Sequence, residues 1–137
     1  GGIVARGLFT LPDFDPAVVN TIITQATPHQ KPVVSFDEDL HHYYQRVNQY
    51  WRSEGGQAAL RHVTVVSTGG GHRDVQVRYA LTRLDGIVAD DRAISASTTS
   101  IPKSWVSTDH KCSVWCRQMV LLTQRALFDA VDPRTNQ

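Results

Sequence analysis

The chain has 137 residues, of which 41% are hydrophobic and 20% are charged, and its formal net charge at pH 7 is +1. This balance is typical of a globular protein and excludes a fibre or a largely disordered chain. Because the basic residues form no run interleaved with aromatic residues, nucleic acid is not an expected partner. No apolar stretch approaches the ~18 residues that cross a bilayer. We expect one domain spanning residues 1–137.

The N-terminal segment, residues 1–9, predicts a helix of small and apolar residues that Pro12 stops. It carries no capping residue, so it looks like the continuation of a preceding element. Small residues at a helix start allow close packing on a strand, which the helix after a nucleophile elbow requires. A glycine-rich, irregular terminus is the alternative interpretation.

A β-branched run over residues 18–24 follows turn residues and predicts a central, buried strand. His29 comes shortly after this strand. Open α/β sheets keep their active-site crevice at the carboxyl ends of the strands, which places His29 where a ligand could be contacted. A loop histidine that only hydrogen-bonds to the backbone is the favoured alternative.

Residues 37–54 predict an amphipathic helix that a glycine pair at 55 and 56 ends. Its apolar stripe consists of Leu40, Tyr44, Val47 and Trp51. His41 and His42 lie beside acidic residues, which raises the question of a metal site. Adjacent residues on a helix face different ways, so one ion rarely binds both, and no metal is expected.

A second predicted strand, residues 61–67, runs into three consecutive glycines at 69–71 and then Asp74. Glycine permits a sharp turn at positive φ, which allows Asp74 to face a crevice instead of continuing the strand. An ordinary glycine turn followed by a solvated acid is the alternative.

A third predicted strand, residues 93–101, is followed by a polar loop with His110 and by a long helix over residues 112–131. The wide apolar face of that helix predicts burial against the sheet. Cys112 and Cys116 are four residues apart on it, where a disulfide is poorly placed, so we expect free thiols that face the core.

The alternation of helices and strands favours an α/β fold with a parallel sheet. Asp74 after one strand and His110 after the next match the last two members of the Ser…Asp…His order of α/β-hydrolases. No Gly-x-Ser-x-Gly occurs, so we expect Gly1 or Gly2 to close an elbow whose serine precedes residue 1. Asp109 is the rival acid, but a side chain adjacent to His110 cannot easily reach its ring.

These stretches resemble the GPI inositol-deacylase family over nearly the whole chain. Residues 1–6 resemble the segment directly after the family's Gly-His-Ser-Met, and residues 69–77 are similar to its glycine-glycine-x-Arg-Asp loop. Residues 100–116 resemble its histidine loop and following helix, and WVSTDH at 105–110 is the most specific part. The sequence departs from the family pattern in the missing serine and everything before it.

The resemblance implies the C-terminal part of an α/β-hydrolase fold, a mostly parallel sheet with flanking helices, without its N-terminal half. It also implies an endoplasmic-reticulum membrane enzyme whose lumenal domain removes the fatty acyl chain from the inositol of GPI anchors, which aids transport of GPI-anchored proteins to the Golgi. Asp74 and His110 would be catalytic, without cofactor or metal. The implied partners are GPI-anchored proteins, acylated inositol glycolipid and, through segments outside this chain, the membrane.

Two alternatives remain open at this stage. One is another lipase or esterase of the same fold, acting on a soluble ester or a diacylglycerol. The other is a non-enzymatic α/β module in which Asp74 and His110 are merely polar loop residues. In either case we expect the residues of this chain to be inactive by themselves, because they contain no nucleophile elbow.

Overall fold

The computed structural model describes residues 1–34 and 36–135. Its centre is a parallel sheet of three strands, β1 (Thr21–Gln25), β2 (Thr64–Gly69) and β3 (Ala93–Ser97), in the spatial order β1-β2-β3. The register pairs Ile22 with Val65 and Val66 with Ile94. The predicted α/β class with a parallel sheet and flanking helices is confirmed.

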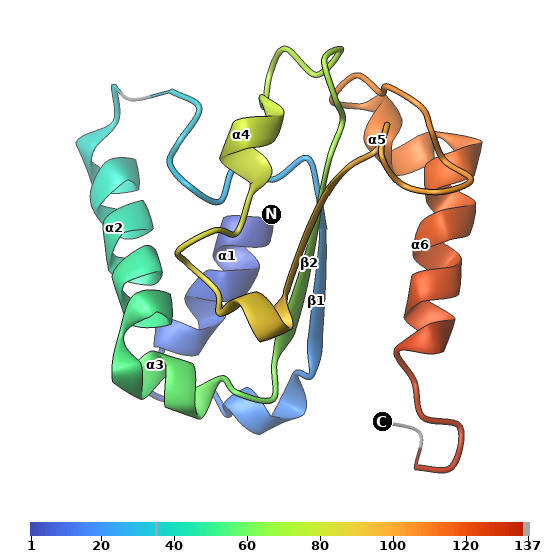
Figure 1. Cartoon of the computed structure of the whole chain (residues 1–137). Helices are drawn as coiled ribbons and strands as arrows, with labels where there is room; N and C mark the ends of the chain where they lie inside the picture. The colour runs from blue at the N-terminus through green and yellow to red at the C-terminus, as the bar shows by residue number, and fades with distance from the viewer. Residues whose placement is uncertain (35, 136–137) are drawn as a thin grey trace.

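The remaining elements surround this sheet (Figure 1). The helices are α1 (Gly2–Gly7), α2 (Glu38–Arg52), α3 (Glu54–Ala59), α4 (Tyr79–Thr82), α5 (Cys112–Trp115) and α6 (Arg117–Asp129), and the 3₁₀ turns are η1 (Leu8–Thr10), η2 (Pro16–Val18) and η3 (Asp90–Arg92). In Figure 1, α1, α2 and α3 lie on one side of the sheet and α5 and α6 lie on the other. No helix of the described residues is long and apolar enough to cross a membrane.

The bounds predicted for the first strand, residues 18–24, are wrong. The strand begins only at Thr21, because residues 16–18 form the turn η2, and Val18 is exposed. Among the strands of the described residues, β2 lies between β1 and β3. β-branched composition predicts an extended, apolar segment, but it does not determine the residue at which the strand begins.

The main core lies between the sheet and α2, where three of the four residues of the predicted apolar stripe are buried and the fourth, Leu40, is exposed. Tyr44, Val47 and Trp51 are buried, and the Trp51 ring packs edge-on against Phe9 with 5.3 Å between ring centroids. The helix begins where the Asp37 side chain accepts a hydrogen bond from the Leu40 amide at 2.9 Å, a side-chain cap worth about 1 kcal/mol. Pattern and cap together explain why this helix is correctly predicted.

The glycine pair at 55 and 56 does not end this helix. Ser53 separates α2 from α3, since its hydroxyl accepts a hydrogen bond from the Gly56 amide and donates one to the Tyr50 carbonyl. A Cβ on Gly56 would lie 1.9 Å from that carbonyl oxygen. A glycine at position 56 therefore allows the start of α3 to lie close to the end of α2.

The prediction of a single buried helix over residues 112–131 is also wrong, because the segment forms two helices. The backbone is extended at Cys116, which separates α5 from α6, and Met119 is the buried residue of α6. Several large apolar side chains of α6 are exposed: Val120, Leu121, Leu127 and Phe128. Apolar periodicity shows which face of a helix is apolar, but not which residues cover it. Both cysteines are free thiols, with Cys116 buried and Cys112 only partly so.

Candidate active site

Asp74 and His110 meet beyond the carboxyl end of the sheet. His110 Nδ1 and Asp74 Oδ2 are 3.1 Å apart, within hydrogen-bond distance. The Asp74 side chain is fully buried, whereas one third of the His110 side chain is exposed. The structure thus brings together the two residues predicted as catalytic, and their roles stay a prediction.

The second carboxylate oxygen of Asp74 is held by its own loop. Oδ1 accepts hydrogen bonds from the amides of Gln76 at 3.1 Å and Val77 at 2.8 Å. Because these contacts fix the carboxylate, Oδ2 remains directed at the histidine. An acid held in this way selects the imidazole tautomer with hydrogen on Nδ1 and leaves Nε2 free to accept a proton.

The glycine turn positions Asp74 by allowing two loops to touch. Gly71 has φ +83°, a backbone conformation that favours glycine. A Cβ on Gly70 would lie 2.7 Å from the Thr108 carbonyl oxygen and 2.9 Å from Asp74 Cβ. The Thr108 amide donates a 2.7 Å hydrogen bond to the Gly70 carbonyl. The acid loop and the histidine loop therefore pack backbone to backbone.

We expect Gly70→Ala to separate these loops. The added methyl group has no space, so the free energy of unfolding falls by roughly 1–3 kcal/mol. Displacement of Asp74 also lowers activity, by about 10- to 100-fold. Gly55→Ala is the matched control, because a Cβ there meets nothing within 4 Å. Denaturant unfolding and turnover measure both effects, and equal behaviour of the two variants would contradict this account of the turn.

Asp109 has a different role from Asp74. Its Oδ1 accepts a 2.8 Å hydrogen bond from the Cys112 amide, at the start of α5. The side chain is exposed, and among the described residues it forms no hydrogen bond or ion pair with the His110 ring, whose partner is Asp74. The preference for Asp74 over the rival acid is consistent with this geometry.

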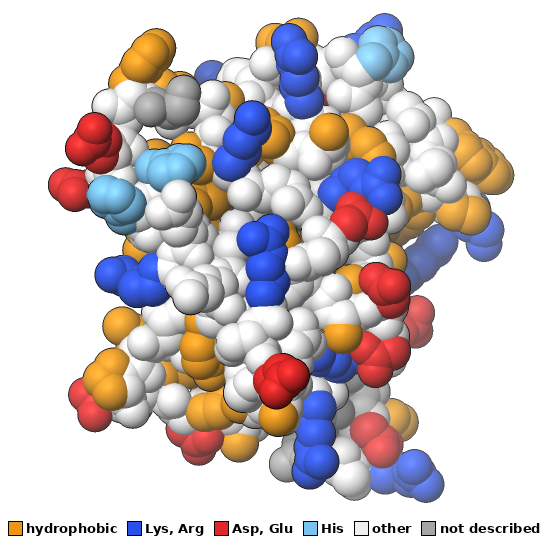
Figure 2. Space-filling model, turned by 60° about the vertical axis from the view of Figure 1, so that its left-hand side comes forward, with side chains coloured by type: hydrophobic (Ala, Val, Ile, Leu, Met, Phe, Trp, Pro, Cys, Tyr) orange, Lys and Arg blue, Asp and Glu red, His pale blue; other side chains and the backbone are white. Residues whose placement is uncertain are grey.

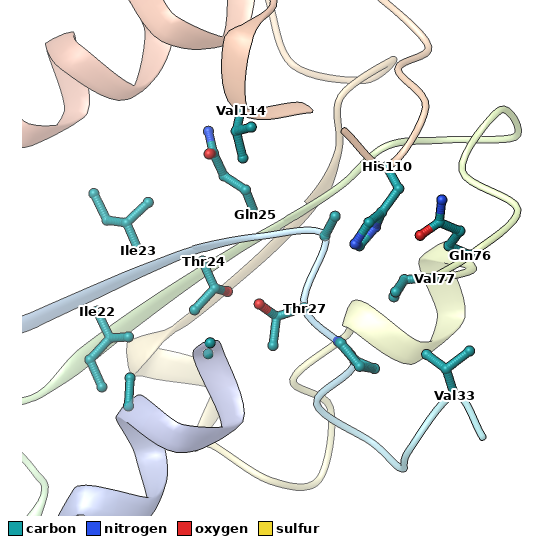
Figure 3. A pocket seen from close by; sticks show the side chains of 15 residues that line it. Ile22, Ile23, Thr24, Gln25, Thr27, Val33, Gln76, Val77, His110 and Val114 are labelled. Carbon is teal, nitrogen blue, oxygen red and sulfur yellow. The ribbon is translucent and has the colours of Figure 1, made fainter. Parts of the chain in front are cut away.

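The His110 ring faces a pocket of about 670 Å³. The pocket wall contains Gly1, Gly2, residues 22–28 and Gln76 in addition to His110, and Val33, Val77 and Val114 add apolar surface. In Figure 3 the ring points toward the space between Thr27 and Gln76. The pocket is thus apolar over much of its wall and carries a few polar groups near the histidine, which suits a ligand with an apolar chain and a polar head.

Sequence reasoning missed Thr27 and Gln76 as pocket residues. Thr27 follows Ala26, which takes φ +49° directly after β1, and Gln76 lies two residues after Asp74. The available signals were the position of Thr27 just beyond the end of β1 and the position of Gln76 close to Asp74 on the loop after β2.

His29 lies outside this pocket. The side chain is fully buried, and its Nε2 is 2.9 Å from the hydroxyl of Thr24. Its carbonyl accepts a 3.1 Å hydrogen bond from Asn48, which also binds the buried guanidinium of Arg6. Because this ring is buried and does not line the pocket, the structure argues against the ligand contact considered for His29. The alternative, a loop histidine with only a hydrogen-bonding role, agrees better with the structure, although the ring contacts the Thr24 hydroxyl and not the backbone.

Burial, with a smaller effect from the Arg6 charge, lowers the pKa of His29 from 6.5 to about 3. The folded protein therefore keeps this ring neutral where the unfolded chain binds a proton, so stability is full above pH 6.5 and is lost as pH falls toward 3. The slope approaches ~1.4 kcal/mol per pH unit. Between pH 6 and 4 we expect His29→Gln to reduce the slope of the free energy of unfolding against pH. The reduction corresponds to up to one proton fewer taken up on unfolding. Identical slopes would show that His29 does not titrate with folding.

Within residues 1–34 and 36–135, no group of three His, Cys, Asp or Glu side chains lies close enough to hold a metal ion. His41 and His42 are both exposed on α2. The Nε2 of His41 contacts the amide of Gln45 at 3.1 Å.

An aspartate–histidine pair at the carboxyl edge of a parallel sheet, facing an open pocket, is the arrangement of α/β-hydrolase-like proteins. Comparison with known proteins assigns the chain to a particular family within this class. The chain belongs to the PGAP1-like alpha/beta domain family, whose model matches residues 1–130.

Several GPI inositol-deacylases are similar to this chain. The Xenopus laevis protein is 48% identical over 100% of the chain and 15% of its own length. The Rattus norvegicus protein is 45% identical over 100% of the chain and 14% of its length. The protein of Coccidioides immitis (strain RS) is 42% identical over 98% of the chain and 12% of its length. The chain thus spans about one seventh of these relatives, and the resemblance to this family is confirmed.

Proposed function

We propose that this chain supplies the acid and the base of a GPI inositol-deacylase, which hydrolyses the ester between a fatty acid and the inositol of a GPI anchor. The observation that carries the proposal is the contact between Asp74 and His110 at a pocket lined also by Gly1 and Gly2. The names of the similar proteins support the substrate. In this proposal the reaction takes place at the lumenal side of the endoplasmic-reticulum membrane and aids transport of GPI-anchored proteins to the Golgi.

The reaction follows from the geometry of the pair. His110 Nε2 accepts the proton of a serine hydroxyl as the serine attacks the acyl carbonyl, and Asp74 stabilises the imidazolium. His110 then donates that proton to the departing inositol oxygen, which leaves an acyl-serine. A water molecule, deprotonated by His110, hydrolyses this ester and releases the fatty acid. The chain's own residues thus orient a base and move one proton at Nε2.

The start of α1 supports a nucleophile at this pocket. A Cβ on Gly2 would lie 2.6 Å from Thr27 Cγ2 and 2.8 Å from Thr24 Cγ2, so α1 packs against β1 at a distance that only glycine permits. The helix after a nucleophile elbow requires such close packing. The serine of this proposal belongs to an elbow that ends at Gly1 or Gly2.

The experiment uses cells that lack inositol deacylation. Their GPI-anchored proteins resist phosphatidylinositol-specific phospholipase, whose attack needs the free inositol hydroxyl. Expression of the complete gene product that carries this chain is expected to make surface GPI-anchored proteins releasable by that phospholipase. Continued resistance, with hydrolysis of a soluble ester or a diacylglycerol by the purified protein, would favour another esterase. Absence of all hydrolysis would favour the non-enzymatic module.

A further inference from the structure

Arg6 carries a buried charge that the proposed reaction does not use directly. Figure 2 shows Lys and Arg side chains that project from the visible surface into solvent. Arg6, in contrast, is fully buried, and no carboxylate of the described residues pairs with it. Burial lowers the pKa of Arg6 from 12.5 to about 10, so the guanidinium stays charged at neutral pH. A buried charge without a partner of opposite sign costs free energy, so a role in stability does not account for it.

The guanidinium connects three segments of the chain. Its Nη2 donates hydrogen bonds to the side-chain oxygen of Asn48 on α2 and, at 3.5 Å, to the carbonyl of His29. The Asn48 amide in turn donates to the carbonyls of His29 at 3.1 Å and Gln30 at 3.2 Å. The guanidinium also lies 5.5 Å from the centroid of the Trp51 ring, whose Nε1 donates a 3.0 Å hydrogen bond to the Arg6 carbonyl. Arg6 therefore joins α1 to α2 and to the segment after β1.

Two of these segments form part of the wall of the pocket that His110 faces. The start of α1 forms one part of this wall, and residues 26–28, directly after β1, form another. The two parts touch, since a Cβ on Gly2 would lie 2.6 Å from Thr27 Cγ2. Arg6 itself does not line the pocket. It therefore acts on the wall from behind.

The position of α1 depends on such contacts because the helix is short. Its six residues form less than two turns, and helices of this length are stable only through tertiary packing. In Figure 1, α1 lies between α2 and the sheet. There is no space for a Cβ on Gly7 beside the Tyr43 hydroxyl of α2. Close packing of this kind sets how near α1 approaches its neighbours, while the directional hydrogen bonds of Arg6 set the rotation of the helix and its position along its axis.

We propose that Arg6 is a positioning residue, which holds the start of α1 in register with residues 26–28 so that the nucleophile reaches His110 Nε2. The proposal rests on the proposed function, in which the serine belongs to an elbow that ends at Gly1 or Gly2. Because this serine directly precedes α1, a shift or rotation of the helix moves its hydroxyl. Misplacement of a reacting group by about 1 Å costs roughly 100-fold in rate, whereas binding of an acyl chain along the wall is less sensitive to it. Arg6 thus acts on kcat more than on KM.

The test compares Arg6→Met with Arg92→Met in the purified complete gene product. Arg92 is the matched control: it too is largely buried and binds the Leu60 carbonyl and the Gln57 side-chain oxygen, but it directly precedes β3 and does not line the pocket. For acylated inositol glycolipid, Arg6→Met is expected to lower kcat about 10- to 100-fold and to change KM by less than about threefold. Arg92→Met is expected to leave both constants within about threefold. Unchanged kcat in folded Arg6→Met would overturn the proposal, as would an equal loss of kcat in both variants.

Arg6→Lys decides the question where the methionine variant does not fold. Lysine keeps the charge and the length of the side chain, but it lacks the planar fork of donors that joins Asn48 to the His29 carbonyl. We expect a folded protein whose kcat is lowered about tenfold at a nearly unchanged KM. A purely structural role predicts normal kcat in the folded fraction, and that result would refute positioning by Arg6.

Labelling with an alkyl fluorophosphonate separates this proposal from the proposed function. A serine that a base activates attacks the phosphorus of this reagent and releases fluoride, so labelling needs no glycolipid. A labelling rate lowered about tenfold in Arg6→Met and kept in Arg92→Met supports the positioning of the nucleophile, and equal rates in all three proteins refute it. Labelling of the unchanged protein without deacylation would refute the deacylase proposal alone. Absence of labelling in the unchanged protein would refute the serine nucleophile and, with it, both proposals.

Discussion

Replacement of His110 by alanine is expected to abolish deacylation, with kcat reduced roughly 10⁴- to 10⁶-fold. Among the described residues that line the pocket, the His110 imidazole is the one group that is both oriented by a buried carboxylate and exposed to accept a proton. Without it the serine stays protonated, and neither acylation nor release of the fatty acid has a base. The measurement is hydrolysis of acylated inositol glycolipid by the purified complete gene product.

The matched control for this prediction is His42→Ala. His42 is exposed on α2 and is not among the residues that line the pocket. Because His110 is itself one third exposed, its removal leaves little buried volume empty, but the fully buried Asp74 carboxylate loses a hydrogen-bond partner, so the free energy of unfolding is expected to fall by about 1–3 kcal/mol. Comparable losses of activity in both variants, or more than a tenth of normal turnover in His110→Ala, would refute the role of His110 as base.

The pairing of Asp74 with His110 could be predicted because it depends on local features that the sequence displays. A glycine turn after one strand and a polar loop after the next place both side chains at the same edge of a parallel sheet. The close approach of Gly70 to Thr108, with the hydrogen bond from the Thr108 amide to the Gly70 carbonyl, then holds the two loops together. Similarly, the apolar stripe and the Asp37 cap of α2 lie within one continuous segment.

The features that could not be predicted depend on neighbours far away in the sequence. The His110 pocket combines the start of α1, the end of β1, Gln76 and Val114, and no short pattern links these segments. The same limit explains α6, whose apolar residues correctly indicate a helix but do not show that Val120, Leu121, Leu127 and Phe128 are exposed. His29 illustrates the reverse case, because its position after a strand end suggested a ligand contact, whereas its side chain is buried and its Nε2 lies 2.9 Å from the Thr24 hydroxyl.

Asp74→Asn is expected to reduce kcat about 10³- to 10⁴-fold and to change KM little. An asparagine has the same shape, and its Oδ1 can still accept the amide hydrogen bonds of Gln76 and Val77. Its Nδ2 then faces His110 Nδ1 and donates to it, which forces the ring hydrogen onto Nε2. In this tautomer His110 can no longer take the serine proton, although the pocket that binds the acyl chain is intact.

Asp109→Asn is the control that discriminates between the two acids. Asparagine at this position keeps the oxygen that accepts the Cys112 amide, so the start of α5 is preserved. We therefore expect activity within about twofold of the unchanged protein, since surface substitutions of this kind have small effects. Nuclear magnetic resonance of the His110 ring nitrogens provides an independent readout, because only Asp74→Asn should move the hydrogen from Nδ1 to Nε2. If Asp109→Asn alone moved the hydrogen and lost activity, Asp109 and not Asp74 would be the acid that orients His110.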